Sequence, residues 1–483
     1  MEIKRKSLHI CILVVVFLPL FIFKGNAQYP GSLMMLPDNF YSQTMNPAYI
    51  RTDKAITVAV PGLAGFSFKN TGSFKISDVI VVNNDGNPEL DFERFYDRNK
   101  SKNFMGTNVS VPLIFISTPT YKGVFSFYYQ ERAQMLSTFK SAIVDYINHG
   151  NQLPEYKNFN SEKINSLSLG ISEFSFGYAQ KVDEKISIGI HGKILFGKII
   201  YSAKDWEYGI GTSESGDKIK LTSKGTGKMS FPVPVYLGYN EQVYYIDGSN
   251  AVHNYFTSYK NPGIAIDLGL TWNLSSSSSM SFAVRDLGGI WFKKNGLNLK
   301  LNNSYNFVGF DLENAIRYQE EYGYINPLNS VLATKEDIRN VYRPIGDTVK
   351  FVKAMPPQTV IHYQLKSSEK LEFGITNQSV FQNKLFYNSF TFSALQKSAN
   401  FSLIESVNIH QLSSLSIGGG FQYTGKLVQV FLLADNVFAF YHPANNKTFS
   451  LTVGMCFLFN HEKNEGNPNG RFLPHLPFYR IKD

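Results

Sequence analysis

Two-residue alternation between apolar and polar side chains is the dominant pattern of the chain. From Ile264 to Leu274 the even positions are apolar and the odd positions are small or polar, and stretches 186–200 and 449–459 repeat the pattern. Because successive strand side chains point to opposite faces, the alternation predicts β-strands with one apolar and one polar face. These stretches are long enough to cross a bilayer as tilted strands, whereas strands in soluble sheets usually have about 5–6 residues.

Stretches of this kind recur fourteen times, and the connections between them alternate in length. Short turns fall on one rim, and the long connections 71–107, 134–164, 202–262 and 293–356 fall on the other. Short periplasmic turns with long outer loops are typical of bacterial outer-membrane barrels. We therefore predict an all-β fold, a transmembrane antiparallel outer-membrane β-barrel of about 14 strands; hairpins in the long loops would bring the range to 12–16. The expected strands are 56–70, 108–117, 123–133, 165–180, 186–201, 263–274, 279–292, 357–366, 371–380, 385–396, 401–410, 415–424, 427–434 and 449–460.

The N-terminus has the three parts of a secretory signal. Lys4, Arg5 and Lys6 precede an apolar stretch, 10–23, and small residues end at Ala27. We expect cleavage after residue 27 and export to the outer membrane of a Gram-negative cell. An uncleaved anchor is the alternative. The tail 461–483 is predicted to lie in the periplasm, either disordered or docked on a partner.

Composition narrows the class of protein further. Aromatic residues make up 15% of the chain and charged residues 18%, which argues against disorder. The net charge of +9 is spread thinly, without the basic patch of a nucleic-acid-binding protein. Cys456 is the only cysteine after the predicted cleavage site, so an internal disulfide is excluded in the mature chain.

A short motif precedes the first expected strand. Asn46-Pro47-Ala48 follows Pro37-Asp38-Asn39-Phe40, and proline restrains Asn46 to extended or turn conformations. The motif resembles the N-terminal plug of long-chain fatty-acid transporters and aromatic-hydrocarbon channels. The run from Asp38 to Asp78, with Arg285-Asp286-Leu287-Gly288-Gly289, is more similar to an uncharacterised outer-membrane barrel family of Bacteroidota, distantly related to those transporters. The resemblance implies fourteen strands, a plug at 28–55 and passage of a lipophilic small molecule.

Several residues are candidates for the lumen or the wall. His191, Asp267 and Arg285 lie on polar strand faces and should point into the lumen, either as structural ion pairs or as guides for a ligand. The apolar phase changes near Ser172 and Glu173, which predicts a β-bulge that either adjusts curvature or opens the wall sideways.

The remaining predictions concern helices, chemistry and partners. Apolar residues at helical spacing predict a short loop helix over 137–149. The chain lacks Gly-x-Ser-x-Gly and His-Glu-x-x-His motifs and shows no metal-ligand spacing, so we predict no enzyme, cofactor or metal. A Ser/His pair from separate strands would be the remaining route to a hydrolase. We expect contact with outer-membrane lipid and carry two functions: a channel for a lipophilic small molecule, and a structural or secretion-partner barrel without transport that contacts a periplasmic protein.

Overall fold

The structure is a computed structural model. It describes residues 30–82, 87–99, 102–141, 158–161, 163–212, 219–233, 235–237, 243–246, 250–307, 340–382, 385–410 and 415–459 of the 483-residue chain. The predicted signal at 1–27 and the predicted tail at 461–483 lie outside these residues. In the described part, none of the helices combines the length and the apolar character needed to span a bilayer.

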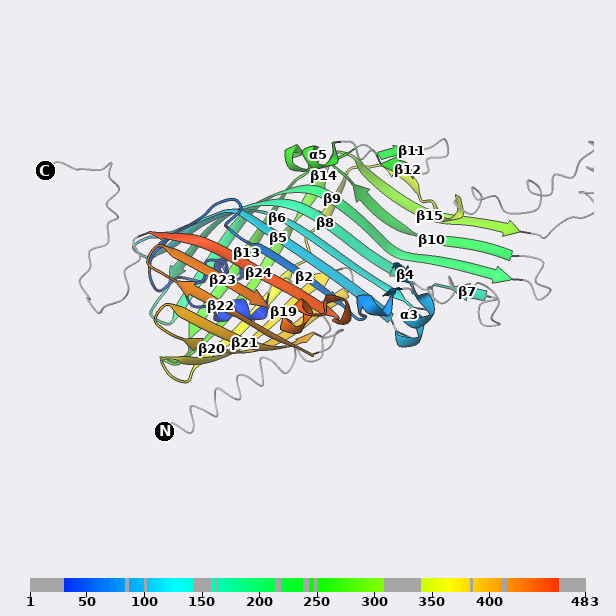
Figure 1. The fold of residues 1–483 in the computed structure, drawn as a ribbon. Coiled ribbons are helices and arrows are strands. Elements are labelled where there is room, and N and C mark those ends of the chain that lie inside the picture. Colours follow the sequence, from blue (N-terminus) through cyan, green and yellow to red (C-terminus); the bar gives the residue numbers. More distant parts are fainter. Residues whose placement is uncertain are drawn as a thin grey trace, which may run out of the picture.

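A ring of 14 antiparallel strands forms the body of the described molecule (Figure 1). The last strand pairs with the first, which closes the ring: Ile56 is opposite Phe459, and Phe66 is opposite Val453. Closure removes the strand edges, whose backbone groups would find no partner in lipid. The ring consists of β1 (Ile56–Ala59) and β2 (Phe66–Gly72), which share one position, followed by β5 (Lys102–Pro119), β6 (Gly123–Lys140), β8 (Ile164–Lys181), β9 (Ile186–Thr212), β13 (Pro262–Asn273), β14 (Ser278–Phe292), β18 (Gln358–Lys366), β19 (Leu371–Gln382), β20 (Leu385–Lys397), β21 (Phe401–His410), β22 (Leu415–Thr424), β23 (Val428–Ala434) and β24 (Thr448–Phe459).

Shorter elements extend the rim that carries the long connections. β10 (Ile219–Ser230) pairs with the far end of β9, and β15 (Gly296–Phe307) pairs with the other side of β10, so that these two strands lengthen the wall there (Figure 1). The central connections therefore contain regular strands, as the range of strand numbers allowed. The other elements are η2 (Gly31–Met35), α2 (Ser42–Met45), η3 (Ile76–Asp78), β3 (Ile80–Val82), β4 (Pro88–Leu90), α3 (Phe92–Arg98), β7 (Asn158–Asn160), β11 (Val235–Leu237), β12 (Val243–Ile246), α5 (Ala251–Thr257), β16 (Ile345–Thr348), β17 (Phe351–Ala354), η5 (Val437–Phe440) and η6 (Pro443–Asn445).

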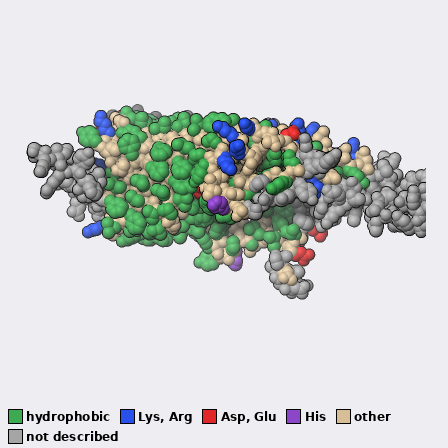
Figure 2. Space-filling view, turned by 90° about the horizontal axis from the view of Figure 1, so that it is seen from above, with side chains coloured by type: hydrophobic (Ala, Val, Ile, Leu, Met, Phe, Trp, Pro, Cys, Tyr) green, Lys and Arg blue, Asp and Glu red, His purple; other side chains and the backbone are tan. Residues whose placement is uncertain are grey.

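The exterior of the wall is apolar. On β13, Ile264, Ile266 and Leu268 are 59%, 43% and 45% exposed, whereas Asp267 between them is fully buried. Hydrophobic side chains cover the barrel wall in Figure 2, and Lys and Arg side chains appear at both ends of this band. The predicted assignment of the two strand faces is thus confirmed on this strand, because the apolar stripe points outward as lipid requires.

The predicted helix at 137–149 is wrong over its first four residues. Residues 137–140 continue β6, where Ser137 pairs with Met105 and Lys140 with Lys102; residues 142–149 lie outside the described part. Of the apolar residues whose spacing suggested a helix, only Phe139 lies in the described part, and it pairs with Asn103 of β5.

The first wall strand is interrupted. Residues 60–65 separate β1 from β2, with Gly62 and Gly65 at positive φ angles of 83° and 122°. Met455 of β24 donates its backbone N–H to the Leu63 oxygen, so one bond still bridges the interruption. On its other side, β5 carries Pro112, which cannot donate a ladder bond. The ladder of the wall is therefore weakened on both sides of this point.

Candidate functional site

The N-terminal segment 30–55 packs against inward-facing side chains of the wall. Thr376 of β19 donates to the Gly31 oxygen at 2.8 Å, and Gln422 of β22 donates to the Pro37 oxygen at 2.6 Å. Gln429 of β23 donates to the Asp38 oxygen at 3.0 Å. Asn39, which is fully buried, donates back to Gln422. Glutamine and threonine at inward positions thus supply the partners that the backbone of this segment needs.

The predicted plug turn contacts a pair of glycines in the wall. Gly189 of β9 and Gly269 of β13 lie opposite each other. A Cβ at Gly189 would lie 2.2 Å from the Pro47 oxygen, and a Cβ at Gly269 would lie 2.2 Å from Asn46 Oδ1. Asn46 Oδ1 also accepts the backbone N–H of Ala48 at 2.9 Å. The Asn-Pro-Ala turn therefore reaches the wall only where no side chain stands in its way.

An aromatic cluster lies between the N-terminal segment and the wall. The Phe40 ring packs 5.2 Å from Phe115 of β5 and 5.9 Å from Phe431 of β23, and Tyr41 packs 5.5 Å from Phe431. A Cβ at Gly65 would lie 3.2 Å from the Tyr41 ring, so this cluster stands directly behind the interruption between β1 and β2. The rings fill the lumen at the weakest part of the wall.

A carboxylate pair and an arginine secure the end of the segment. Arg51 is nearly buried and pairs with Asp53 at 2.6 Å, while Asp38 accepts from the hydroxyl of Thr52. Burial and the neighbouring Asp53 raise the pKa of the Asp38 carboxyl; Arg51 and Thr52 offset this in part. Protonation of Asp38 would therefore relieve its repulsion with Asp53 within this segment.

The three predicted lumen residues meet in one buried ion network. His191 Nδ1 lies 3.6 Å from Asp267 Oδ2, and the exposed fractions of His191, Asp267 and Arg285 are 1%, 0% and 1%. Lys193 of β9 contacts Asp267 at 2.7 Å and Asp286 at 2.8 Å. Buried charges require partners of opposite charge, and ion pairs supply them across β6, β8, β9, β13 and β14.

Four members of the network, Arg132, Lys193, Asp286 and Gln358, were not predicted. Arg132 of β6 pairs with Asp286 at 2.8 Å, and Gln358 of β18 donates to Asp286 at 2.7 Å. Arg132 and Lys193 follow the inward phase of their strands and could have been found by extending the alternation. Asp286 could not, because a bulge in β14 places both Arg285 and Asp286 opposite Asp267, with φ 61° at Asp286.

The predicted bulge does not fall on Ser172 and Glu173 themselves. Both residues pair without a shift to β6 on one side and to β9 on the other, so the wall has no gap there. The extra residue lies in β9, where Lys198 is inserted opposite Gly170 and Ile171. Glu173 points inward and joins the ion network through Lys193 at 3.2 Å.

Ser172 belongs to a separate polar cluster on the outer side of the wall. Its hydroxyl donates to Glu131 at 2.6 Å, and the Tyr255 hydroxyl of α5 donates to the same carboxylate at 3.3 Å. Lys198 donates to the Ser258 oxygen at 2.6 Å and lies 3.9 Å from the centre of the Tyr259 ring. The segment around α5 thus covers these polar groups from outside.

Apolar side chains line the lumen toward the rim of long connections. Leu169 and Ile171 of β8, Leu195 of β9 and Ile290 of β14 are buried in one cluster. A second cluster, built on β9, β10 and β15, continues toward the rim. The lumen therefore changes from polar and charged to apolar along its length.

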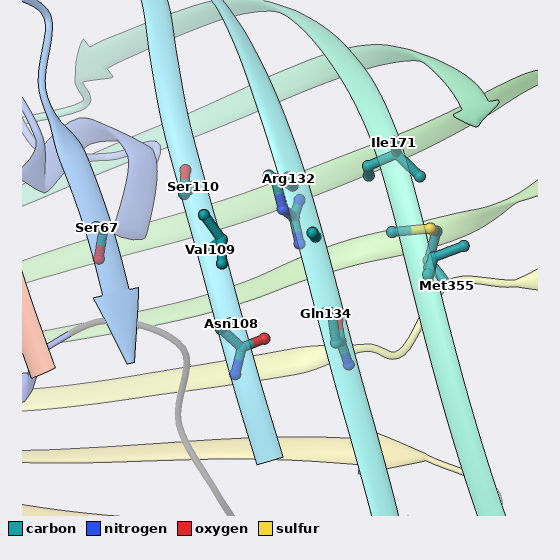
Figure 3. Close-up of a pocket in the computed structure, with 10 residues that line it drawn as sticks. Ser67, Asn108, Val109, Ser110, Arg132, Gln134, Ile171 and Met355 are labelled. Atoms are coloured by element: carbon teal, nitrogen blue, oxygen red, sulfur yellow. The ribbon is translucent and has the colours of Figure 1, made fainter. Parts of the chain in front are cut away.

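A small cavity marks this change. Its volume is about 20 Å³, enough for one water molecule, and Arg132 and Ser110 line one side while Ile171 and Met355 line the other (Figure 3). The cavity is thus a junction between two parts of the lumen, not an open pore.

Ser126, His191 and Asp267 follow one another in the order of a serine–histidine–aspartate catalytic triad. Ser126 Oγ is 3.5 Å from His191 Nε2, and His191 Nδ1 is 3.6 Å from Asp267. Both distances exceed those of a working nucleophile and base, about 2.6–3.2 Å. Asp267 is held by Lys193 and His191 is 1% exposed, so the arrangement is that of a buried structural network.

Comparison with solved structures gives transporters and channels at low similarity. The Ralstonia pickettii toluene transporter TbuX is 10% identical, covers 90% of this chain and 98% of its own, and has a TM-score of 0.41. A Pseudomonas aeruginosa FadL homologue is 10% identical, with 91% and 100% covered and a TM-score of 0.39. The CymD monoaromatic hydrocarbon channel is 10% identical, with 88% and 92% covered and a TM-score of 0.36. Curated protein sequences give no match.

One family model matches the chain itself. The match runs over residues 47–435, from the Asn-Pro-Ala turn through β23, and thus includes most of the barrel. The predicted restriction to Bacteroidota stays a prediction. Because the match covers far more than half of the 483 residues, the chain belongs to the family of unknown function DUF5723.

Proposed function

We propose that this protein is an outer-membrane channel for the passive uptake of a lipophilic small molecule. The observation that carries the proposal is the apolar lining of the lumen toward the rim, where Leu169, Ile171, Leu195 and Ile290 point inward. A water-filled barrel carries polar side chains on its inner face. An inner face that is apolar over part of its length offers a molecule with low water solubility a favourable environment.

The ion network and the wall suggest a route. The charged groups around Lys193 and Asp286 form a barrier to an apolar molecule, because its passage would separate these charges from their polar partners at a large cost in free energy. The interruption at residues 60–65 lies in the wall beside the aromatic pair Phe40 and Tyr41. We propose that the molecule leaves sideways there, into the membrane.

The segment 28–55 acts as the plug in this proposal. A ring of this size is wide enough to leak if its interior is empty. The contacts of Asn46 and Pro47 with the wall, and those of Gln422 and Gln429 with the segment, support an obstructing role. Release of the Phe40 and Tyr41 rings would open the sideways route.

Uptake of N-phenylnaphthylamine by intact cells tests the proposal. This probe fluoresces once it passes the outer membrane and dissolves in phospholipid. Cells that contain the barrel should take it up faster than cells without it, and Leu169→Gln with Ile171→Gln should lower the rate toward that of cells without it. Ile264→Val, which alters only the lipid-facing wall, is the control. Equal rates with and without the barrel would refute uptake of this class of molecule.

The small cavity favours the second function, a structural or secretion-partner barrel without transport. A volume of about 20 Å³ at this junction is enough for one water molecule and too small for a lipophilic molecule in this conformation. If this function holds, uptake is unaffected by the barrel, and purification of the full chain from membranes in mild detergent recovers one periplasmic protein in constant ratio. Loss of that protein on removal of residues 461–483 would assign the contact to the tail.

A further inference from the structure

An apolar groove crosses the outer face of the wall at the end that carries the short turns. We call it the aromatic groove. Two cross-strand ring pairs form its sides: Phe125 with Tyr178, whose ring centres are 4.6 Å apart, and Phe127 with Phe176, at 5.0 Å. Its volume is about 480 Å³, which is within the usual range for small-molecule sites. The groove is lined by Ile116, Thr118, Phe125, Ser126, Phe127, Phe176, Gly177, Tyr178 and Ile190.

The bottom of the groove is backbone, because the residue pair between the two ring pairs points inward. Gly177 and Ser126 pair across β6 and β8 and point inward, so that only their backbone lines the groove. Gly192 lies opposite Phe176 on β9, and a Cβ there would have no heavy atom within 4 Å. The surrounding side chains are well exposed on the lipid-facing wall: Phe125 is 54% exposed and Phe176 is 56% exposed. The occupant of such a groove is hydrocarbon, because this surface faces the acyl chains of the bilayer.

Basic side chains stand at the membrane surface above the groove. Lys122 follows β5 and Lys181 ends β8, and both are exposed. The backbone N–H of Lys181 donates to the Lys122 oxygen, so the two residues are neighbours. Phe125 comes three residues after Lys122, and Tyr178 comes three residues before Lys181. Three residues span about 10 Å along a strand. A phospholipid covers such a distance between its phosphate and the upper part of its acyl chains.

The acidic groups that follow Lys181 lie in the next turn. Asp183 Oδ1 accepts the backbone N–H groups of Lys185 and Ile186 at 2.7 and 2.6 Å, so this carboxylate is turned into its own loop. Glu184 and Lys185 are both exposed and offset each other. The excess positive charge at the groove therefore belongs to Lys122 and Lys181.

We propose that the aromatic groove holds one acyl chain of an anionic phospholipid, whose phosphate is bound by Lys122 and Lys181. The lipid is a bound partner of the wall, and the proposal does not depend on what passes through the lumen. Each lysine near a membrane surface contributes about fivefold to the affinity for anionic lipid, so the pair contributes about thirtyfold.

Native mass spectrometry of the full chain in detergent measures this binding directly. Dioleoyl phosphatidylglycerol and dioleoyl phosphatidylcholine are titrated separately. The wild-type chain should bind the anionic lipid about thirtyfold more tightly, and Lys122→Ser with Lys181→Ser should remove that difference. Lys426→Ser is the matched control, because Lys426 is an exposed lysine in another short turn of the same rim.

A second variant tests the acyl-chain part. Gly192→Leu places a side chain beside Phe176 in open space, so the barrel should fold and show the usual shift on unheated gels while lipid binding falls at least tenfold. Three results would overturn the proposal: equal affinity for the two lipids, equal loss in the Lys426→Ser control, or full binding by Gly192→Leu. Preference for lipid A over phosphatidylglycerol at the same lysines would also overturn it, because that lipid belongs to the opposite leaflet.

Discussion

The glycine pair that receives the Asn-Pro-Ala turn gives a sharp test of how the N-terminal segment is held. In Gly269→Ala the new Cβ would lie 2.2 Å from Asn46 Oδ1 and 2.6 Å from the Ala48 nitrogen. Nonbonded heavy atoms pack at about 3.5–4 Å, so the turn must retreat by roughly 1.5 Å. Gly189→Ala meets the Pro47 carbonyl in the same way, at 2.2 Å.

The size of the effect follows from what that retreat breaks. Asn46 Nδ2 donates to the Leu270 oxygen at 3.4 Å and to Thr271 at 3.3 Å, and both bonds would be lost. Overpacking costs about 1–3 kcal/mol, and each lost hydrogen bond costs about 0.5–1.5 kcal/mol. A loss of about 3 kcal/mol is expected, which raises the population of the released segment roughly hundredfold.

Hydrogen exchange of the purified barrel measures that population. The reporters are the amides of Ala48, bonded to Asn46 Oδ1 at 2.9 Å, and of Tyr49, bonded to the Asn46 oxygen at 3.0 Å. Both should exchange roughly a hundredfold faster in Gly269→Ala, while the wall strands keep their protection. Gly192→Ala on β9 is the control, since nothing lies within 4 Å of its Cβ. Unchanged exchange in both Gly269→Ala and Gly189→Ala would refute the reasoning.

Three further predictions concern the ion network, the thiol and pH. Asp286→Asn leaves the positive charges of Arg132 and Lys193 undercompensated, and should lower stability by about 3–5 kcal/mol, measured as the temperature at which the barrel unfolds on gels; an unchanged temperature would contradict this. Cys456 is fully buried in the cluster beneath the N-terminal segment, so it should resist maleimide in the folded mature chain and react once residues 28–55 are deleted; labelling of the intact barrel would show that the segment does not cover it. Burial and Asp53 raise the pKa of the Asp38 carboxyl in the folded chain. The stability contributed by protonated Asp38 is therefore fully present below the ordinary pKa of 3.8 and is lost as pH rises through the raised pKa. Asp38→Asn should remove this part of the pH dependence of thermal unfolding, and a pH profile identical to that of the wild type would exclude this role of Asp38.

The two-residue alternation of apolar and polar residues predicted the wall strands well, because one face of each wall strand contacts lipid. The strands expected at 401–410 and 415–424 match β21 and β22 end to end. It failed at Ser172 and Glu173 because Leu167, Leu169 and Ile171 are apolar yet point inward. The prediction assumed that the apolar face of a strand always contacts lipid, and this assumption fails where the lumen itself is apolar.

The ion network shows a second limit of sequence reasoning. His191 and Asp267, which were expected in the lumen, lie in unbroken stretches of alternation, and both side chains are buried. Asp286 was missed because one extra residue in β14 reverses the phase, and only the pairing with β13 reveals it. The contacts of segment 30–55 with Gln422 and Gln429 join residues nearly 400 positions apart, which no local pattern encodes.

The pairing of the first and last strands has a consequence for how the molecule is made. Ile56 cannot meet Phe459 until the ribosome has finished almost the whole chain, so the nascent protein has two unsatisfied margins throughout synthesis and export. Such distant pairing is slow to form, and loose margins attract other chains. The polypeptide must therefore reach its membrane unfolded, and a chain truncated before β24 should not form a closed barrel.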